Sequence, residues 1–526
     1  MSELAAAPVA SAPRSAHRPH VPVRGLVIVL LMVALAAALG ALGGNNPVLA
    51  IAAAGAVLLA ISMAIRPDVA SIVVLGVIYS NAAVVAVQFH GVPAFAAVAV
   101  PVLLVVPLGY QLIVRRRPVV ITSAFPLIVI FFLIQILGTI FSSDLDTAMN
   151  DLVTFIVEGI GLYFLIVNTV RSQQTLRWAV WVLLAVGMAS GLLSFYQNAT
   201  KSYTNNFGGF AQMSLAVLNT GDPADAQPRL AGPIGEKNRY AQIMLMLVPL
   251  GVFWAFSSKS RLAKLAALGA AGAASFGVAL TFSRGAAVGF VLVLVIMFAL
   301  GYIKKYQVGL VAVAVAALLL VFPTYGSRIG SLVNLTSSVT SDSSTVSADG
   351  AILSRATEGL TALLVFADHP LLGVGPGLFP EYYPLYADEV GIRVLNADRE
   401  AHNLYLHIAA ENGILGLAAF LGILGLTLRD LIRVRRRTLT SHPEMAMMAT
   451  GLMLAIVTYM ATGLFLHLSY ARYFYLMLAL AGAAGHIGLR MIAEDQRVAT
   501  VAAARTTRFR LGGHKRTAPP VATPSA

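Results

Sequence analysis

The sequence predicts an all-α protein, a polytopic transmembrane helix bundle of about 14 spans with a large, partly helical extracytoplasmic loop. Two observations lead to this fold class. Hydrophobic residues make up 58% of the 526 residues and charged residues only 11%, a balance too apolar for the surface of a soluble domain. Apolar runs also recur from Leu26 to Leu489, and each is close to the roughly 20 residues that a spanning helix needs.

The elements follow one another in a simple order along the chain. A polar, Pro-rich head, 1–24, is predicted to be a disordered cytoplasmic tail. Because a second span follows the first at once, the first apolar run is interpreted as an anchor and not as a cleavable signal. The membrane domain, 25–489, holds predicted spans at 25–43, 47–65, 69–89, 94–114, 123–141, 153–170, 178–196, 239–256, 265–282, 286–303, 308–322, 402–428, 446–466 and 473–489. The last segment, 490–526, is basic and is predicted to be a disordered cytoplasmic tail near anionic lipid.

The charge balance predicts the orientation of these spans. The formal net charge is +13, from 36 Lys and Arg against 23 Asp and Glu. With the amino terminus in the cytoplasm, most of these cations fall on inner segments, which is the positive-inside bias, and both termini are cytoplasmic. Because this bias accounts for the basic charge, we expect membrane lipids and not nucleic acid around the chain.

Two predicted outer segments, 197–238 and 323–401, are long, whereas most other connections are short. Functional residues are expected on such segments. The second opens with a polar stretch, 336–347, that is typical of a mobile linker. Apolar residues then fall at helical spacing from Ser354 to Phe366, which predicts an amphipathic helix at the membrane surface that ends before His369.

Two arginines in this outer region are candidate ligands for a phosphorylated lipid. Arg229 lies in a Gly- and Pro-containing stretch just before a span, and Arg284 lies in a tight hairpin between two spans. Guanidinium groups bind phosphate oxygens in pairs of hydrogen bonds, so two of them near the headgroup level suit a lipid diphosphate. The alternative is that both simply reach ordinary phospholipid headgroups.

His402 is the candidate general base, because it opens a predicted span directly after the long outer segment. A neutral imidazole there is suited to take a proton from a sugar hydroxyl near neutral pH. His407 and Glu411 are four residues apart on the same predicted helix and form a second candidate pair, and Arg355 is a further supporting candidate. The competing interpretation is structural, because a histidine at a helix start often serves only as a hydrogen-bonding group.

The residue types exclude several other chemistries. Cysteine is absent, so disulfides, thiolate catalysis and Cys-bound zinc are ruled out. Asp144, Asp146 and Asp151 lie close together but lack a partnering histidine, and no metal site is predicted.

Four stretches taken together resemble the O-antigen ligase and polymerase superfamily of bacterial membrane glycosyltransferases. They are Arg229 to Ala241, Leu280 to Gly285, His369 to Phe379, and His402 to Gly416, in that order, with the large outer segment before the last spans. The resemblance covers roughly residues 120 to 485. Its motifs are short and degenerate individually, and their combination carries the specificity.

The resemblance implies a metal-independent glycosyltransferase without a cofactor in the bacterial cytoplasmic membrane. It would move a glycan from a polyprenyl diphosphate donor to a hydroxyl of a glycan, lipid or protein acceptor on the outer side, alongside envelope-polysaccharide assembly partners. In family terms, Arg229 and Arg284 would hold the diphosphate, and His402 would activate the acceptor hydroxyl. The number of spans and the long polar termini depart from the simplest family pattern and leave polymerase and ligase both open.

Two other classes of function fit parts of the sequence. A transporter or flippase for an anionic or lipid-linked substrate would also have many spans, but it should concentrate polar groups at mid-membrane, where Glu158 is the most obvious charge. A non-catalytic membrane scaffold would leave the combination of Arg229, Arg284 and His402 unexplained.

Overall fold

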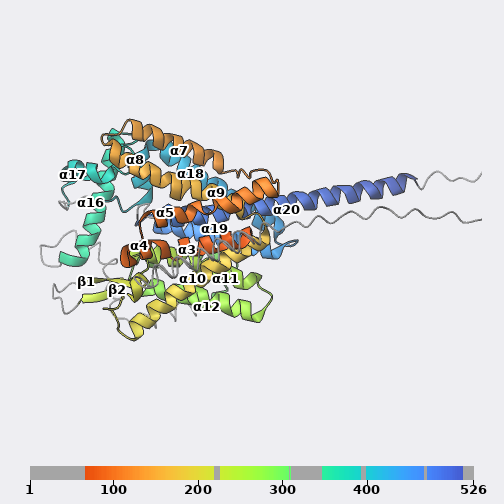
Figure 1. Ribbon diagram of the computed structural model, residues 1–526, viewed down its shortest axis with the longest axis horizontal. Helices are drawn as coiled ribbons and strands as arrows, with labels where there is room; N and C mark the ends of the chain where they lie inside the picture. Colours follow the sequence, from red (N-terminus) through yellow and green to blue (C-terminus); the bar gives the residue numbers. More distant parts are fainter. Residues whose placement is uncertain are drawn as a thin grey trace, which may run out of the picture. The chain divides into compact units, whose positions relative to one another are not determined.

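The computed structural model describes residues 66–217, 226–306, 309, 346–392, 399–466 and 471–512. The chain divides into two compact units, Met1–Pro67 and Asp68–Ala526, and nearly all described residues belong to the second. This second unit is a helix bundle with a small group of helices and strands gathered at one end (Figure 1). The predicted spans 25–43 and 47–65, and nearly all of 308–322, lie outside the described residues.

Eight helices of the described part are long and apolar enough to cross a membrane, which confirms a multi-pass membrane protein. They are α5 (Phe95–Val102) with α6 (Val105–Gly109) and η1 (Tyr110–Val114), α8 (Leu145–Thr154) with η2 (Phe155–Gly161) and α9 (Leu162–Thr169), α10 (Gln173–Ala199), α11 (Lys237–Ser257), α12 (Arg261–Ala279), α18 (Leu404–Thr438), α19 (Pro443–Thr462) and α20 (Ala471–Gly512).

Three further apolar segments correspond to predicted spans. Helices α3 (Pro67–Tyr79) and α4 (Ala82–His90) are bent by 53° at a break, and they form a ninth span if they are counted as one. The bend lies at Asn81, whose backbone is left-handed at φ 58°, a conformation that asparagine tolerates better than most residues. Helices α7 (Phe125–Ile140) and α13 (Arg284–Ala299) are apolar but shorter. The total of about 14 spans stays a prediction.

Helices α11 and α19 form the centre of the bundle and pack against each other. Both bury residues around their whole circumference, as expected of helices surrounded by protein instead of lipid. Small residues let the neighbouring helices approach closely. A Cβ atom on Gly191 of α10, for example, would lie 2.2 Å from the carbonyl oxygen of Ala273 on α12.

A layer of aromatic rings joins α7, η2, α18 and α20 beside this centre. Phe155 makes edge contacts with Phe131 and Tyr475, and Phe420 and Phe474 continue the layer. Such pairs add packing energy beyond the area that they bury. They fix the helices that carry the polar residues described below.

The group at the end of the bundle contains α16 (Val346–Asp368), α17 (Phe379–Val390) and a hairpin of β1 (Gln212–Val217) and β2 (Ala226–Gly232) (Figure 1). Helix α16 confirms the helix predicted over 354–366 and extends it toward the amino terminus. The antiparallel hairpin was not predicted, so the chain is mostly but not entirely α-helical. Helices α16 and α17 share a small apolar core with the start of α18.

Helix α18 is interrupted close to this apolar core. Gly413 has φ 63° and ψ −168°, so the helical hydrogen bonding fails there. The loop between α16 and α17 crosses the break, where Val374 N donates to Ala410 O at 3.0 Å and Gly375 N donates to Glu411 O at 3.0 Å. This loop, which contains Gly373, Gly375 and Gly377 and which we call the glycine-rich loop, thus satisfies carbonyl groups that the break releases.

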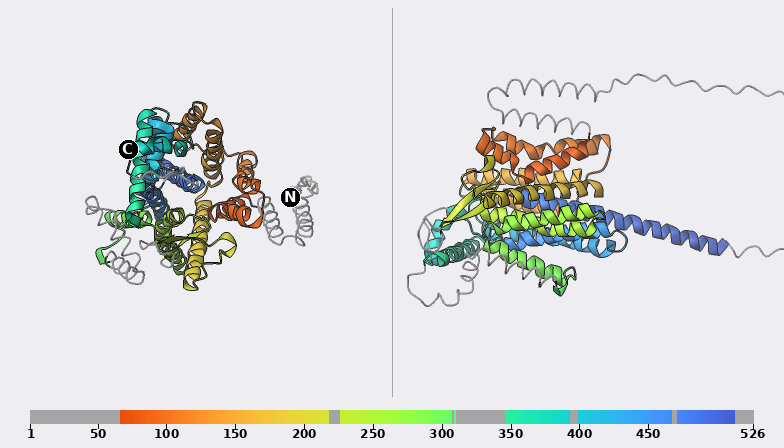
Figure 2. Two further views of the ribbon diagram at one scale, coloured as in Figure 1. Left: turned by 90° about the vertical axis from the view of Figure 1, so that its left-hand side faces the viewer. Right: turned by 90° about the horizontal axis from the view of Figure 1, so that it is seen from below.

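Helix α20 continues to Gly512, beyond the predicted end of the last span at residue 489, and extends past the other helices (Figure 2). Its side chains from 493 to 501 are exposed. The first part of the tail that was predicted to be disordered is therefore helical in the structure, because alanine and arginine sustain a helix without tertiary contacts.

Candidate functional site

His402 lies at the start of α18 and is held from several directions. Its backbone is left-handed at φ 45°, a conformation that is strained for a histidine. The next residue, Asn403, caps α18 by accepting hydrogen bonds from Tyr405 N at 3.0 Å and Leu406 N at 3.1 Å. The strained backbone of His402 and the N-cap at Asn403 indicate that the imidazole of His402 has a fixed direction.

Glu358 of α16 is the partner of this histidine. Its side chain is only 1% exposed, and its Oε2 atom lies 3.0 Å from His402 Nδ1. Its Oε1 atom accepts a hydrogen bond from Arg399 Nε at 2.9 Å and lies 2.8 Å from Arg399 Nη2 in an ion pair. A buried carboxylate therefore lies against the imidazole, whose Nδ1 bonds to the carbonyl oxygen of Glu400 at 2.9 Å, and an arginine balances its charge.

Arg284 is the first residue of α13 and is presented by a tight turn. Phe282 adopts φ 51°, and Ser283 caps the helix through a hydrogen bond from Ala286 N. Arg229 of β2 supports this turn from behind, because its Nε donates to Thr281 O at 2.7 Å and its Nη2 donates to Phe282 O at 3.2 Å. Its guanidinium is thereby committed to backbone carbonyls.

Arg355 lies within electrostatic reach of both Arg284 and Glu358, the carboxylate beside His402. Arg355 precedes Glu358 by three residues on α16 and so lies on the same helical face. Burial and the nearby positive charge of Arg284 lower the pKa of Arg355, while Glu358 and Glu236 act in the opposite direction. The pKa of a guanidinium stays far above neutrality, so two mutually repelling cations lie close together here.

A second polar group lies one turn further along α18. His407 Nε2 is 3.2 Å from Glu411 Oε2, and His407 Nδ1 is 3.6 Å from Glu400 Oε2. The pKa of Glu400 is raised by burial and by Asp151, while the charges of Arg239 and His402 oppose this. The buried Arg239 of α11 and His402 therefore both lie within electrostatic reach of Glu400.

A polar cavity of about 220 Å³ opens beside His407 and Glu411. Its walls come from α7, from α8 and η2, from the glycine-rich loop and the start of α17, from α18 with the preceding Glu400, and from the start of α20. They carry the carboxyl groups of Asp151, Glu158, Glu400 and Glu411, the amides of Gln135 and Asn412, and the rings of Phe131 and Phe155. We call this space the acidic cavity.

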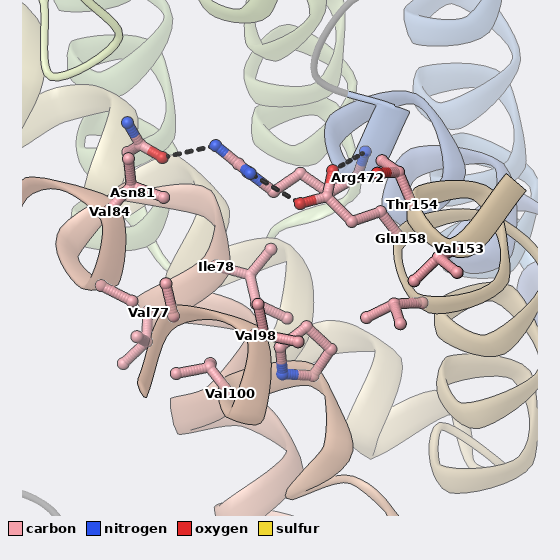
Figure 3. Close-up of a pocket in the computed structure, with 14 residues that line it drawn as sticks. Val77, Ile78, Asn81, Val84, Val98, Val100, Val153, Thr154, Glu158 and Arg472 are labelled. Atoms are coloured by element: carbon pink, nitrogen blue, oxygen red, sulfur yellow. Dashed lines mark hydrogen bonds and ion pairs between the residues drawn. The ribbon is translucent and has the colours of Figure 1, made fainter. Parts of the chain in front are cut away.

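An apolar cavity of about 280 Å³ lies next to it, between α3, α4, α5 and η2 (Figure 3). Valine, isoleucine, alanine and proline form most of its lining, and Arg472 bounds one side. Arg472 bonds to Glu158 Oε1 at 2.7 Å and to Asn81 Oδ1 at 2.8 Å, as the dashed lines in Figure 3 show. Glu158 and Thr154 line both cavities.

Contacts connect most of the predicted site residues. Arg229 bonds to the turn of Arg284, Arg284 lies within electrostatic reach of Arg355, and Glu358 on the same helix contacts His402. The predicted pair His407 and Glu411 is in contact.

The roles of these residues remain predictions. Within the described residues, no group of three or more His, Asp or Glu side chains could hold a metal ion.

Four residues of this site were not singled out from the sequence, namely Arg239, Glu358, Arg399 and Glu400. Arg239 offered a signal, because it is a cation inside the apolar run of α11. Glu358 lies within the helix predicted over 354–366. Nothing in the sequence pattern pairs it with His402, because that contact joins two distant segments.

Residues 268–421 match a family model described as O-Antigen ligase. The matched range contains three of the four stretches on which the resemblance was based, and it includes Arg284, Glu358 and His402. No curated protein matches the chain. The match confirms the resemblance to the superfamily, and it leaves the donor and the acceptor open.

Proposed function

We propose, from the premise that this membrane protein carries an O-antigen ligase domain at residues 268–421, that it transfers a glycan from a polyprenyl diphosphate to an acceptor hydroxyl. The reaction would take place on the outer side of the cytoplasmic membrane. The observation that carries the proposal is the contact between His402 and the buried Glu358, close to the cations Arg355 and Arg284.

The two cations would bind the diphosphate of the glycan donor. Arg284 and Arg355 repel each other, and an anion between them would remove that cost. A diphosphate offers several oxygens to paired guanidinium donors. Arg284 also begins a helix of 16 residues, whose amino terminus favours negative charge. Arg229 would act here by supporting the turn that presents Arg284.

His402 supplies the base. With Nδ1–H donated to the carbonyl oxygen of Glu400, and the Glu358 carboxylate 3.0 Å from the same nitrogen, the other ring nitrogen, Nε2, would take the proton of the acceptor hydroxyl. The hydroxyl oxygen forms a bond to the anomeric carbon of the donor sugar, and the bond from that carbon to the diphosphate oxygen breaks. The electron pair leaves with the polyprenyl diphosphate, whose added negative charge the arginines stabilise.

The test is turnover by purified protein supplied with a polyprenyl-diphosphate glycan and an acceptor glycan. We expect release of polyprenyl diphosphate, with His402→Ala and Arg284→Ala each losing most of the activity while staying folded. His442→Ala is a matched control, because the ring of His442 bonds to Asp495 at the other end of the bundle. Full activity of both site variants would refute the assignment of these residues.

A transporter or flippase is the alternative function. The observation in its favour is the ion pair of Arg472 and Glu158, whose side chains are mostly buried in helices long enough to span. Transport of the intact donor across liposomes, without release of polyprenyl diphosphate, would favour this alternative over transfer.

A further inference from the structure

The acidic cavity offers an unusual set of chemical groups. Asp151, Glu400 and Glu411 are carboxyl groups that can accept hydrogen bonds, and Glu158 is already paired with Arg472. His407 lies against two of these carboxyl groups. A ligand of this cavity therefore has to supply hydrogen-bond donors.

Two amide side chains give an independent indication of a ligand. Gln135 is 6% exposed and Asn412 is 4% exposed, and both line the cavity. Among the residues that the structure describes, neither Gln135 Oε1 nor Asn412 Oδ1 has a hydrogen-bond partner. Buried acceptors are normally paired, so two unpaired ones on the wall of one cavity indicate donors that come from a ligand.

Charge restricts the class of ligand. The described walls of the cavity carry four carboxyl groups and no arginine or lysine, so they offer a phosphate no cationic partner, whereas Arg284 and Arg355 on α13 and α16 do. A metal ion is not favoured, because no group of three ligands is in place among the described residues. A neutral molecule rich in hydroxyl groups remains.

Size and shape agree with one sugar ring. The cavity of about 220 Å³ is smaller than the roughly 300–1,000 Å³ of pockets for drug-sized ligands. Phe131 and Phe155 provide apolar faces on which the C–H side of a sugar ring can pack.

We propose that the acidic cavity binds a neutral sugar of the acceptor glycan. The proposal rests on the proposed function, because it assigns the arginines to the donor diphosphate and the carboxyl groups to the acceptor. Glu400 connects the two halves, since its carbonyl oxygen lies 2.9 Å from His402 Nδ1 and its carboxyl group lines the cavity. His402 then lies between the donor and the acceptor, where a general base has to act.

Binding can be tested without turnover. Purified protein in detergent is titrated with methyl glycosides of neutral hexoses, N-acetylhexosamines and deoxyhexoses, and saturation-transfer NMR reports binding. We expect saturable binding of at least one glycoside, weakened about tenfold in Gln135→Leu and in Asp151→Asn, since each loses a hydrogen bond to the sugar. Thr139→Val is the matched control on α7, because Thr139 is buried but bonds to its own helix and does not line the cavity.

Several results would overturn the assignment. They are the absence of binding by every glycoside, equal affinity in the wild type and both cavity variants, and displacement of the bound glycoside by inorganic pyrophosphate. A divalent cation that raises the melting temperature in wild type but not in Asp151→Asn would identify a cation site instead. Asp151→Asn preserves the shape of the side chain, so the test stands even if Gln135→Leu does not fold.

Turnover then separates this inference from the proposed function. If both are right, the cavity variants raise the KM for the acceptor and leave the KM for the donor unchanged. Glycoside binding that depends on Gln135, without any turnover, would refute glycan transfer and keep the sugar site. Turnover with an unchanged acceptor KM in both variants would refute the sugar site and keep the transfer reaction.

Discussion

Replacement of Glu358 by glutamine tests the centre of the proposed mechanism. The change keeps the size of the side chain but removes the charge that faces His402 at 3.0 Å and Arg399 at 2.8 Å. One charge-assisted hydrogen bond, from Arg399 Nε, and two close charge contacts lose the carboxylate charge, at a cost of about 1 kcal/mol each. Because the side chains of His402 and Arg399 are 27% and 33% exposed, we expect a net loss of stability of about 1–2 kcal/mol.

The effect on catalysis should be larger than the effect on stability. A positioned general base contributes roughly 10²–10⁴-fold to rate, and a misdirected imidazole should lose about a hundredfold in kcat, or about 2.7 kcal/mol. The KM for the donor should change little, because Glu358 does not bind the diphosphate in this mechanism. Steady-state release of polyprenyl diphosphate measures both constants.

A double mutant gives the sharpest form of this test. If Glu358 acts only through His402, then Glu358→Gln should cause no further loss of kcat in the His402→Ala background. Glu444→Gln is the control for charge removal, because Glu444 pairs with Arg177 in a partly exposed ion pair. Additive losses in the double mutant would refute the idea that Glu358 positions the histidine.

Three further predictions concern stability. Burial raises the pKa of Glu400 in the folded protein. Its contribution to stability is therefore fully present below the ordinary pKa of 4.5 and is lost as the pH rises through the raised value. Glu400→Gln should flatten the fall of the melting temperature with pH over that range. Gly373→Ala should lower the free energy of unfolding by about 2–4 kcal/mol, because φ is 71° and the new Cβ would lie 2.3 Å from the backbone of α18. Gly391→Ala is the control: φ is 62° there, but the nearest atom to the new Cβ is 3.7 Å away, so we expect a loss of only about 1–2 kcal/mol. Denaturant unfolding measures both. Glu158→Ala should cost about 3–5 kcal/mol because it leaves Arg472 buried without its carboxylate, and an unchanged melting temperature would contradict the importance of that pair.

The sequence was sufficient for the features that depend on local composition. Apolar runs of spanning length located α10, α11, α12 and α19 to within a few residues, because a membrane helix satisfies its backbone within one continuous segment. Helical spacing of apolar residues likewise predicted α16. The pairing of β1 with β2 was missed, because the strands are short and their pairing is a contact between segments.

The candidate site was predicted only in part for the same reason. His402, Arg284 and Arg355 were recognised individually because each is a polar residue at an informative place in the pattern. Their connections through Glu358 and Arg399 depend on how α16 folds back over the start of α18, which no local pattern encodes. The acidic cavity is assembled from five separate segments, and the sequence indicated only the pair His407 and Glu411 and the isolated charge Glu158 in its walls.

The break in α18 at Gly413 has a mechanical consequence. The short piece, 404–412, includes His407 and is tied to the loop between α16 and α17, whereas the long piece runs on to Thr438. We expect the two pieces to respond to different forces. When bilayer thickness or curvature tilts the long piece, we expect Gly413 to serve as a pivot, so that the imidazole of His402 keeps its alignment with α16 and α17 and not with the lipid.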